Sequence, residues 1–153
     1  MALIHSILMG AVAGMRSMTP LATVANAARM GALPADSGAP RLLAGPLASA
    51  GALAVAAGEL AGDKMKSAPD RIVPAGMVAR VATGALAGMA LAPRHQRGVA
   101  ALLGAGAAVG AAYLTFNLRM RAIDRYGQTA TGAVEDAVAV GSAALIARSA
   151  AED

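Results

Sequence analysis

The sequence predicts an all-α membrane protein, a polytopic bundle of about five hydrophobic segments that forms a single domain over residues 1–153. The chain is 57% hydrophobic. Only 14% of its residues are charged, roughly half the fraction found in soluble domains. The charges gather between long apolar runs and do not recur at every turn, as they would on an amphipathic soluble helix. Together these features favour a chain whose helices face lipid.

The source of the apolar content leaves one alternative class open. It comes mainly from Ala, Leu, Val and Met, with no Trp, one Phe and two Tyr. Membrane proteins commonly carry Trp and Tyr at both interfaces, so an alanine-rich soluble helical bundle is the alternative. The absence of Cys excludes disulfides and thiolate metal sites. The net charge of +4 is modest, and the basic residues sit in short loops, which suits lipid headgroups better than nucleic acid.

The first apolar run covers residues 2–28, and we interpret it as a retained span, not as a signal peptide. It is long enough to cross a bilayer core of about 30 Å. The polar stretch from Arg16 to Pro20 interrupts it. Thr19 followed by Pro20 is typical of an N-cap with proline at the first helical position. The run is therefore either two half-helices, about 3–15 and 20–30, or one helix kinked at Pro20.

Four more apolar runs follow a turn-rich loop at residues 31–41. They cover residues 42–62, 75–92, 98–118 and 130–148. Charged loops are expected at 63–73 and 119–129, with Pro74 opening the third segment and a short solvated tail at 149–153. Lys and Arg are spread evenly over the two faces that five spans would create, so the positive-inside rule does not choose an orientation.

Pairs of glycines four residues apart recur along the runs. They are Gly10/Gly14, Gly58/Gly62, Gly84/Gly88 and Gly106/Gly110. In lipid such pairs let helix backbones approach closely, although a GC-rich genome would also enrich glycine and alanine. Residues 10–15 match residues 84–89, which indicates an internal repeat. Transporter-like folds often place their site at a repeat interface, between proline-interrupted segments.

Polar residues inside or beside the apolar runs are expected to converge into a substrate-binding site. A charge near the bilayer centre costs several kcal/mol and usually faces a partner or water. Glu59 and Asp63 share a helix face at i, i+4 spacing. The natural buried contact pairs Arg16 or Arg80 with one of two adjacent carboxylates. The full set is Arg16, Ser17, Thr19, Glu59, Asp63, Arg80, Asn117, Arg121, Arg125, Glu135 and Asp136.

Three interpretations of this set remain open. Arg16, Ser17 and the N–H groups of a half-helix starting near Pro20 suit a phosphate or carboxylate group. The carboxylates with Asn117 suit Mg²⁺, Ca²⁺ or a proton relay, although the nearby arginines weigh against a bare cation site. The third interpretation is that the ion pairs only lock the bundle. Buried pairs rarely add net stability over apolar packing, which favours a use beyond stability.

Signatures of enzymes are thin. The chain has no Gly-x-Ser-x-Gly, His-Glu-x-x-His or phosphate-binding-loop motif. His5 and His95 are expected at the membrane interface. We therefore predict neither an enzyme nor a cofactor. An intramembrane hydrolase using Asp63 or Glu135 is the one enzymatic alternative.

Several motifs resemble those of a domain-of-unknown-function family, the one numbered 4126. They are residues 14–20 (Gly-Met-Arg-Ser-Met-Thr-Pro), residues 58–64 (Gly-Glu-Leu-Ala-Gly-Asp-Lys) with the prolines and arginine that follow, and the late Arg-Tyr-Gly and Glu-Asp at 125–127 and 135–136. The resemblance covers nearly the whole chain. It implies a small bacterial integral membrane protein whose polar clusters define the family, and it brings no activity. Residues 65–67 replace a proline-rich stretch expected there.

These observations lead to one expected function and two alternatives. We expect a multi-pass protein of the cell inner membrane, a homodimer through its glycine faces, in contact with membrane lipids and not with nucleic acid. It would form a transporter or channel-like pathway for a small anionic solute or lipid headgroup. The alternatives are a non-transporting scaffold or lipid-binding protein whose ion pairs are structural, and a cation or proton pathway that uses the carboxylates.

Overall fold

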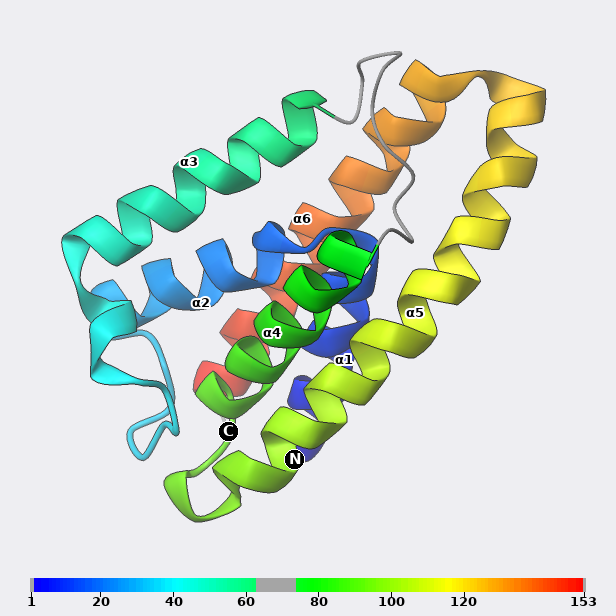
Figure 1. Cartoon of the computed structure of the whole chain (residues 1–153). Helices are drawn as coiled ribbons and strands as arrows, with labels where there is room; N and C mark the ends of the chain where they lie inside the picture. Colours follow the sequence, from blue (N-terminus) through cyan, green and yellow to red (C-terminus); the bar gives the residue numbers. More distant parts are fainter. Residues whose placement is uncertain (1, 63–73, 153) are drawn as a thin grey trace.

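The computed structural model describes residues 2–62 and 74–152, and this part of the chain is helical, with no β-strand (Figure 1). The all-α class is therefore confirmed. The only extended pairing in the described part is an isolated bridge between Ser37 and Pro93. The elements are α1 (Ala2–Met15), α2 (Met18–Arg29), the 3-10 turn η1 (Arg41–Ala44), α3 (Pro46–Gly62), α4 (Pro74–Ala90), the 3-10 turn η2 (Arg94–Gln96), α5 (Arg97–Tyr126) and α6 (Gln128–Glu152).

The first apolar run is broken into two helices, so the continuous kinked helix is wrong. α1 ends at Met15 and α2 begins at Met18, with Ser17 at the N-cap position. The expected cap at Thr19 is also wrong, because helix α2 starts earlier and Pro20 is its third residue. The reason is a carboxylate from α3 that binds the N–H groups of Ser17 and Met18, which lets the helix begin there.

The charged segment at residues 119–129 is not a loop. Helix α5 continues through it to Tyr126, and Gly127, with φ of 82°, makes a sharp turn into α6. No glycine or proline interrupts residues 111–126, so nothing ends the helix earlier. The expected tail at 149–152 is part of α6, which buries Ala150, while Ser149, Ala151 and Glu152 are exposed as expected.

Two of the described helices are long and apolar enough to cross a membrane. They are Arg94–Tyr126, which includes η2, and Gln128–Glu152. α1 has 14 residues and is about 21 Å long, while α3 and α4 have 17 residues each and are about 25 Å long. All five predicted hydrophobic segments form helices, and two of them have the length of a full span.

Helices α1 and α4 pack closely on α5, through glycines that the sequence singled out. A Cβ atom at Gly10 or at Gly84 would overlap the backbone of Gly104. Gly14 lies against Ala108, further along α5, whereas Gly88 lies against Ala100. Helix α1 therefore runs parallel to α5, and α4 runs antiparallel to it. The two matching hexapeptides thus occupy opposite orientations on one helix. Their glycines permit the close approach that small pairs allow.

The other two glycine pairs do not pack within the chain as expected. No atom of the described residues lies within 4 Å of a Cβ built at Gly106, Gly110 or Gly58. The surroundings of Gly62 lie outside the described residues. The small residues of α5 that α1 and α4 contact are Ala100, Gly104, Ala108 and Ala112, on a different face.

Buried and exposed residues are sorted by size on the two long helices. The buried face of α6 carries Gly132, Asp136, Ala139, Ala143, Ala147 and Ala150. Large aliphatic side chains point outward instead, such as Leu102 on α5 at 76% exposure and Leu145 on α6 at 68%. A soluble bundle buries its large side chains and shows polar ones outside. The observed sorting is the reverse.

Helices α2 and α3 form an arm beside this bundle (Figure 1). α3 packs mainly on α2 and η1. Their shared core is small and consists of Ala22, Ala25, Ala52 and Ala56 with three partly buried neighbours. On α2, Val24 also belongs to the main apolar core with residues of α4 and α6. It is therefore α3, and not α2, whose position depends most on polar contacts.

Substituting Gly104 by alanine is expected to lower the free energy of unfolding by about 1–3 kcal/mol, since the added methyl group would meet the carbonyl of Gly84. Gly141→Ala on α6 is the matched control, because a Cβ there meets no described atom within 4 Å. The control should be neutral or stabilising by up to about 1 kcal/mol, through helix propensity. Thermal unfolding in detergent, followed by circular dichroism, compares the two. Equal midpoints would contradict the close approach.

Candidate functional site

The polar residues converge on the break between α1 and α2. Arg16 lies in this break and its side chain is 0% exposed. Its Nη2 atom contacts the Asp136 carboxylate and lies 4.0 Å from Oε2 of Glu135. The expected buried contact between Arg16 and the adjacent carboxylates of α6 is therefore confirmed. An arginine enclosed in an apolar bundle needs such partners, because an uncompensated buried charge is very costly.

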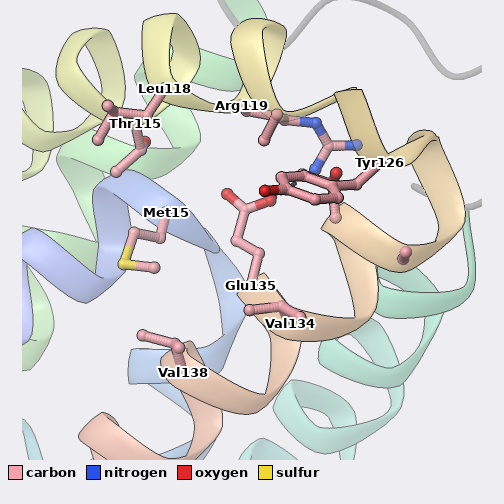
Figure 2. Close-up of a pocket in the computed structure, with 11 residues that line it drawn as sticks. Met15, Thr115, Leu118, Arg119, Tyr126, Val134, Glu135 and Val138 are labelled. Atoms are coloured by element: carbon pink, nitrogen blue, oxygen red, sulfur yellow. Dashed lines mark hydrogen bonds and ion pairs between the residues drawn. The ribbon is translucent and has the colours of Figure 1, made fainter. Parts of the chain in front are cut away.

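Arg119 of α5 completes this ion-pair network, and the sequence did not single it out. Its Nη1 donates to Oε2 of Glu135 at 2.6 Å (Figure 2). The charges of residues 119–129 predict a loop there, but the stretch after residue 111 has no helix breaker, which is the signal that places Arg119 on α5. Glu135 is thus shared between an arginine of α5 and, at longer range, Arg16 in the break.

Glu59 of α3 closes the N-terminal end of α2. Its Oε1 accepts hydrogen bonds from the backbone N of Ser17 at 2.9 Å and the hydroxyl of Ser17 at 2.8 Å. Its Oε2 accepts from the backbone N of Met18 at 2.9 Å. The first N–H groups of a helix have no partner within it, and they carry partial positive charge. The donors that the sequence predicts for an anion are thus engaged by the protein's own Glu59 carboxylate.

Arg80 of α4 binds the C-terminal end of α1, on the other side of the break. Its side chain is buried, and its Nε donates to the backbone carbonyl of Gly14 at 3.1 Å. The last carbonyls of a helix lack partners within it, and they carry partial negative charge. A cation therefore meets the carbonyl end of α1, and an anion meets the N–H end of α2.

Other predicted site residues lie outside the buried cluster. Asn117 is exposed and donates to the carbonyl of Tyr113 in its own helix at 2.9 Å. Arg121 and Arg125 are exposed as well, and Arg125 lies over the Tyr126 ring, 5.7 Å from its centroid. These three therefore do not belong to the buried cluster at the break. They are spaced four apart on the continuing helix α5, so they share an outer face while Arg119 points inward.

The remaining predicted residues are placed as follows. Thr19 is buried on α2, and its hydroxyl has no hydrogen-bond partner. Asp63 lies outside the described residues. His5 is buried, not interfacial, and its Nε2 lies 3.3 Å from the Ser149 hydroxyl, joining the start of α1 to the end of α6. His95 is exposed in η2.

Three guanidinium groups and three carboxylates of the described residues lie around the break. The described guanidinium groups are Arg16, Arg80 and Arg119, and the described carboxylates are Glu59, Glu135 and Asp136. Within residues 2–62 and 74–152, no group of three His, Asp or Glu side chains could hold a metal ion. The chemistry of the cluster is thus recognition of carboxylates by guanidinium groups and helix N–H groups.

A groove borders the cluster between α5 and α6. It has a volume of about 560 Å³ and lies beside the Arg119–Glu135 pair, with Met15 of α1 also in its wall (Figure 2). Aliphatic side chains of both long helices form most of its surface. No sequence signal indicated this groove, because it arises from how α5 and α6 lie relative to each other.

Comparisons of the chain with protein-family models, with curated proteins and with solved structures find no match. The resemblance to the family numbered 4126 therefore stays a prediction that rests on the motifs alone.

The Arg16–Asp136 contact is testable by a double-mutant cycle. We expect Arg16→Gln and Asp136→Asn each to lower the free energy of unfolding by about 3–5 kcal/mol, because each leaves a buried charge without this partner. The double variant should cost clearly less than the sum. Arg125→Gln, at an exposed position, should change stability by less than about 0.5 kcal/mol. Unfolding in mixed micelles measures all four, and single variants no worse than Arg125→Gln would contradict the pairing.

Proposed function

We propose that the chain is a small multi-pass protein of the inner membrane that binds lipid and does not transport, with ion pairs that hold its helices together. One observation supports this above the others. The long helices turn small residues inward and large aliphatic ones outward, including Leu102, Leu114 and Leu145. Lipid tails are as apolar as leucine, so membrane helices associate through small residues and keep large ones toward the lipid.

The shorter helices fit the same environment. In a bilayer core, every backbone polar group must be satisfied within the protein. The break between α1 and α2 meets this condition, because Arg80 binds a carbonyl at one side and Glu59 binds N–H groups at the other. Non-helical backbone surrounded by protein is tolerated at membrane depth. The resemblance to a family of small membrane proteins supports the same location.

The state of the polar cluster favours a structural role over a transport pathway. The donors at the start of α2 are engaged by Glu59, and Arg16 is wholly buried beside Asp136. An anion moving through the bundle would have to displace the protein's own carboxylates from these donors. The charges around the break supply an internal partner for each end of the broken helix.

A small-anion transporter is the second candidate, and the Glu59 contact supports it. The start of α2 binds a carboxylate through three hydrogen bonds of 2.8–2.9 Å. A solute carboxylate or phosphate could take the same donors if α3 moved away with Glu59. α3 packs mainly on α2 and η1, so such a movement would leave the α1–α4–α5 packing intact.

We also propose a homodimer, in which fewer of the glycine pairs are available for the interface. Gly10, Gly14, Gly84 and Gly88 are used within the chain against α5. Gly106 and Gly110 lie on α5 with open space around them, so a second copy could pack there.

Reconstitution into vesicles separates the two candidates. We expect bound lipid in native mass spectra of the detergent-purified protein and no flux of phosphate or small carboxylates above protein-free vesicles. Arg16→Asp should unfold the protein readily, and Arg16→Asp with Asp136→Arg should restore it, if the pair is structural. Flux that Arg16→Ala abolishes, in protein that still inserts, would overturn the proposal and establish the transporter.

A further inference from the structure

We propose that the groove between α5 and α6 holds an acyl chain of an anionic phospholipid, with the phosphate bound at Arg121 and Arg125. This inference rests on the proposed function and names the lipid and its site. The groove volume of about 560 Å³ lies in the range of small-molecule sites, about 300–1,000 Å³.

The lining suits a hydrocarbon chain. Leu118 of α5 and Val134 and Val138 of α6 form its walls, and all three are also exposed, so the groove opens onto the outer surface. The α5 and α6 helices are the two that have the length and composition of membrane spans. An opening on their outer surface would therefore face lipid tails. Hydrating an aliphatic groove is unfavourable, so a hydrocarbon chain is the preferred occupant.

The charged groups of the groove lie together on one part of its wall. Arg119 and Glu135 pair with each other at 2.6 Å, and the Tyr126 ring lies close beside them (Figure 2). This pair neutralises itself, so it does not demand a charged ligand. A chain seated against it would exclude water and strengthen the pair, because charges interact more strongly in a low dielectric.

The headgroup assignment follows from the exposed arginines at the same end of α5. Tyr126 lines the groove, and the Arg125 guanidinium lies over its ring. Arg121 shares the face of Arg125 one turn away, and both side chains are exposed. Basic residues at the end of a membrane span attract anionic headgroups. Charge complementarity thus selects an anionic phospholipid over a second copy of this basic chain.

The test uses native mass spectrometry of the full chain after reconstitution with phosphatidylglycerol or phosphatidylcholine. Val134→Trp fills the groove, and Val140→Trp is the matched control, an exposed valine of α6 outside the lining. We expect Val134→Trp to weaken binding of the retained lipid by at least about tenfold, since it displaces many methylene contacts. Val140→Trp should bind as the unmodified chain does.

A second pair of variants tests the headgroup. The unmodified chain should prefer phosphatidylglycerol by about tenfold, and Arg121→Gln with Arg125→Gln should reduce the preference to about one while a lipid still binds. Arg148→Gln, on α6 outside the groove lining, is the control and should keep the preference.

Three outcomes would overturn the inference. The first is equal lipid binding by Val134→Trp and Val140→Trp, and the second is no headgroup preference in the unmodified chain. The third is conversion of a dimer to a monomer by Val134→Trp alone, which would make a second copy the occupant. In each case a chain that still retains lipid keeps the proposed function, whereas a chain that retains no lipid of either kind contradicts the proposed function itself.

Discussion

The break in the first helix is the constraint on which the rest of the structure depends. Ending α1 at Met15 and starting α2 at Met18 leaves carbonyls on one side and N–H groups on the other without helical partners. Arg80 and Glu59 meet these two ends with the matching sign of charge. Because α3 packs mainly on α2 and η1, the Glu59 contact also ties this arm to the break. The unpaired backbone groups at the break thus help to position α3, through Glu59, and α4, through Arg80.

Arg16 extends this dependence to α5 and α6. A buried guanidinium in the break requires a carboxylate, which Asp136 of α6 supplies, and the neighbouring Glu135 takes Arg119 of α5. The two long helices are therefore joined by charge near their connecting turn at Gly127. Further from this turn, α5 is held by the close approach of α1 and α4 at Gly104. The groove lies beside the Arg119–Glu135 pair, and aliphatic side chains of both helices form most of its wall.

The sorting of side chains assigns different tasks to the inside and the outside of the bundle. Small residues, a few larger apolar ones such as Leu91, and ion pairs make up the described interior. Large aliphatic residues and the exposed arginines of α5 lie on the surface, where contact with a lipid's chain and phosphate is available. The groups most suited to binding a ligand thus lie on the outer surface of the bundle, and the groups that hold the helices together lie at its centre.

The sequence by itself determined the features that arise from local signals. The all-α class followed from long apolar runs, the interruption of the first run from the polar residues 16–20 within it, and a buried contact between an arginine and an α6 carboxylate from the cost of burying a charge. The sequence left open whether the first run breaks or kinks, and which arginine meets which carboxylate. Only the tertiary structure decided that Glu59 closes α2, that Arg119 points inward while Asn117, Arg121 and Arg125 point outward, and that a groove exists. Which α5 side chains point inward depends on the rotation of α5 about its axis, and the groove depends on where α5 lies beside α6. The close approach at Gly104 and the Arg119–Glu135 pair set this rotation and this position, and both are contacts between residues far apart in the sequence.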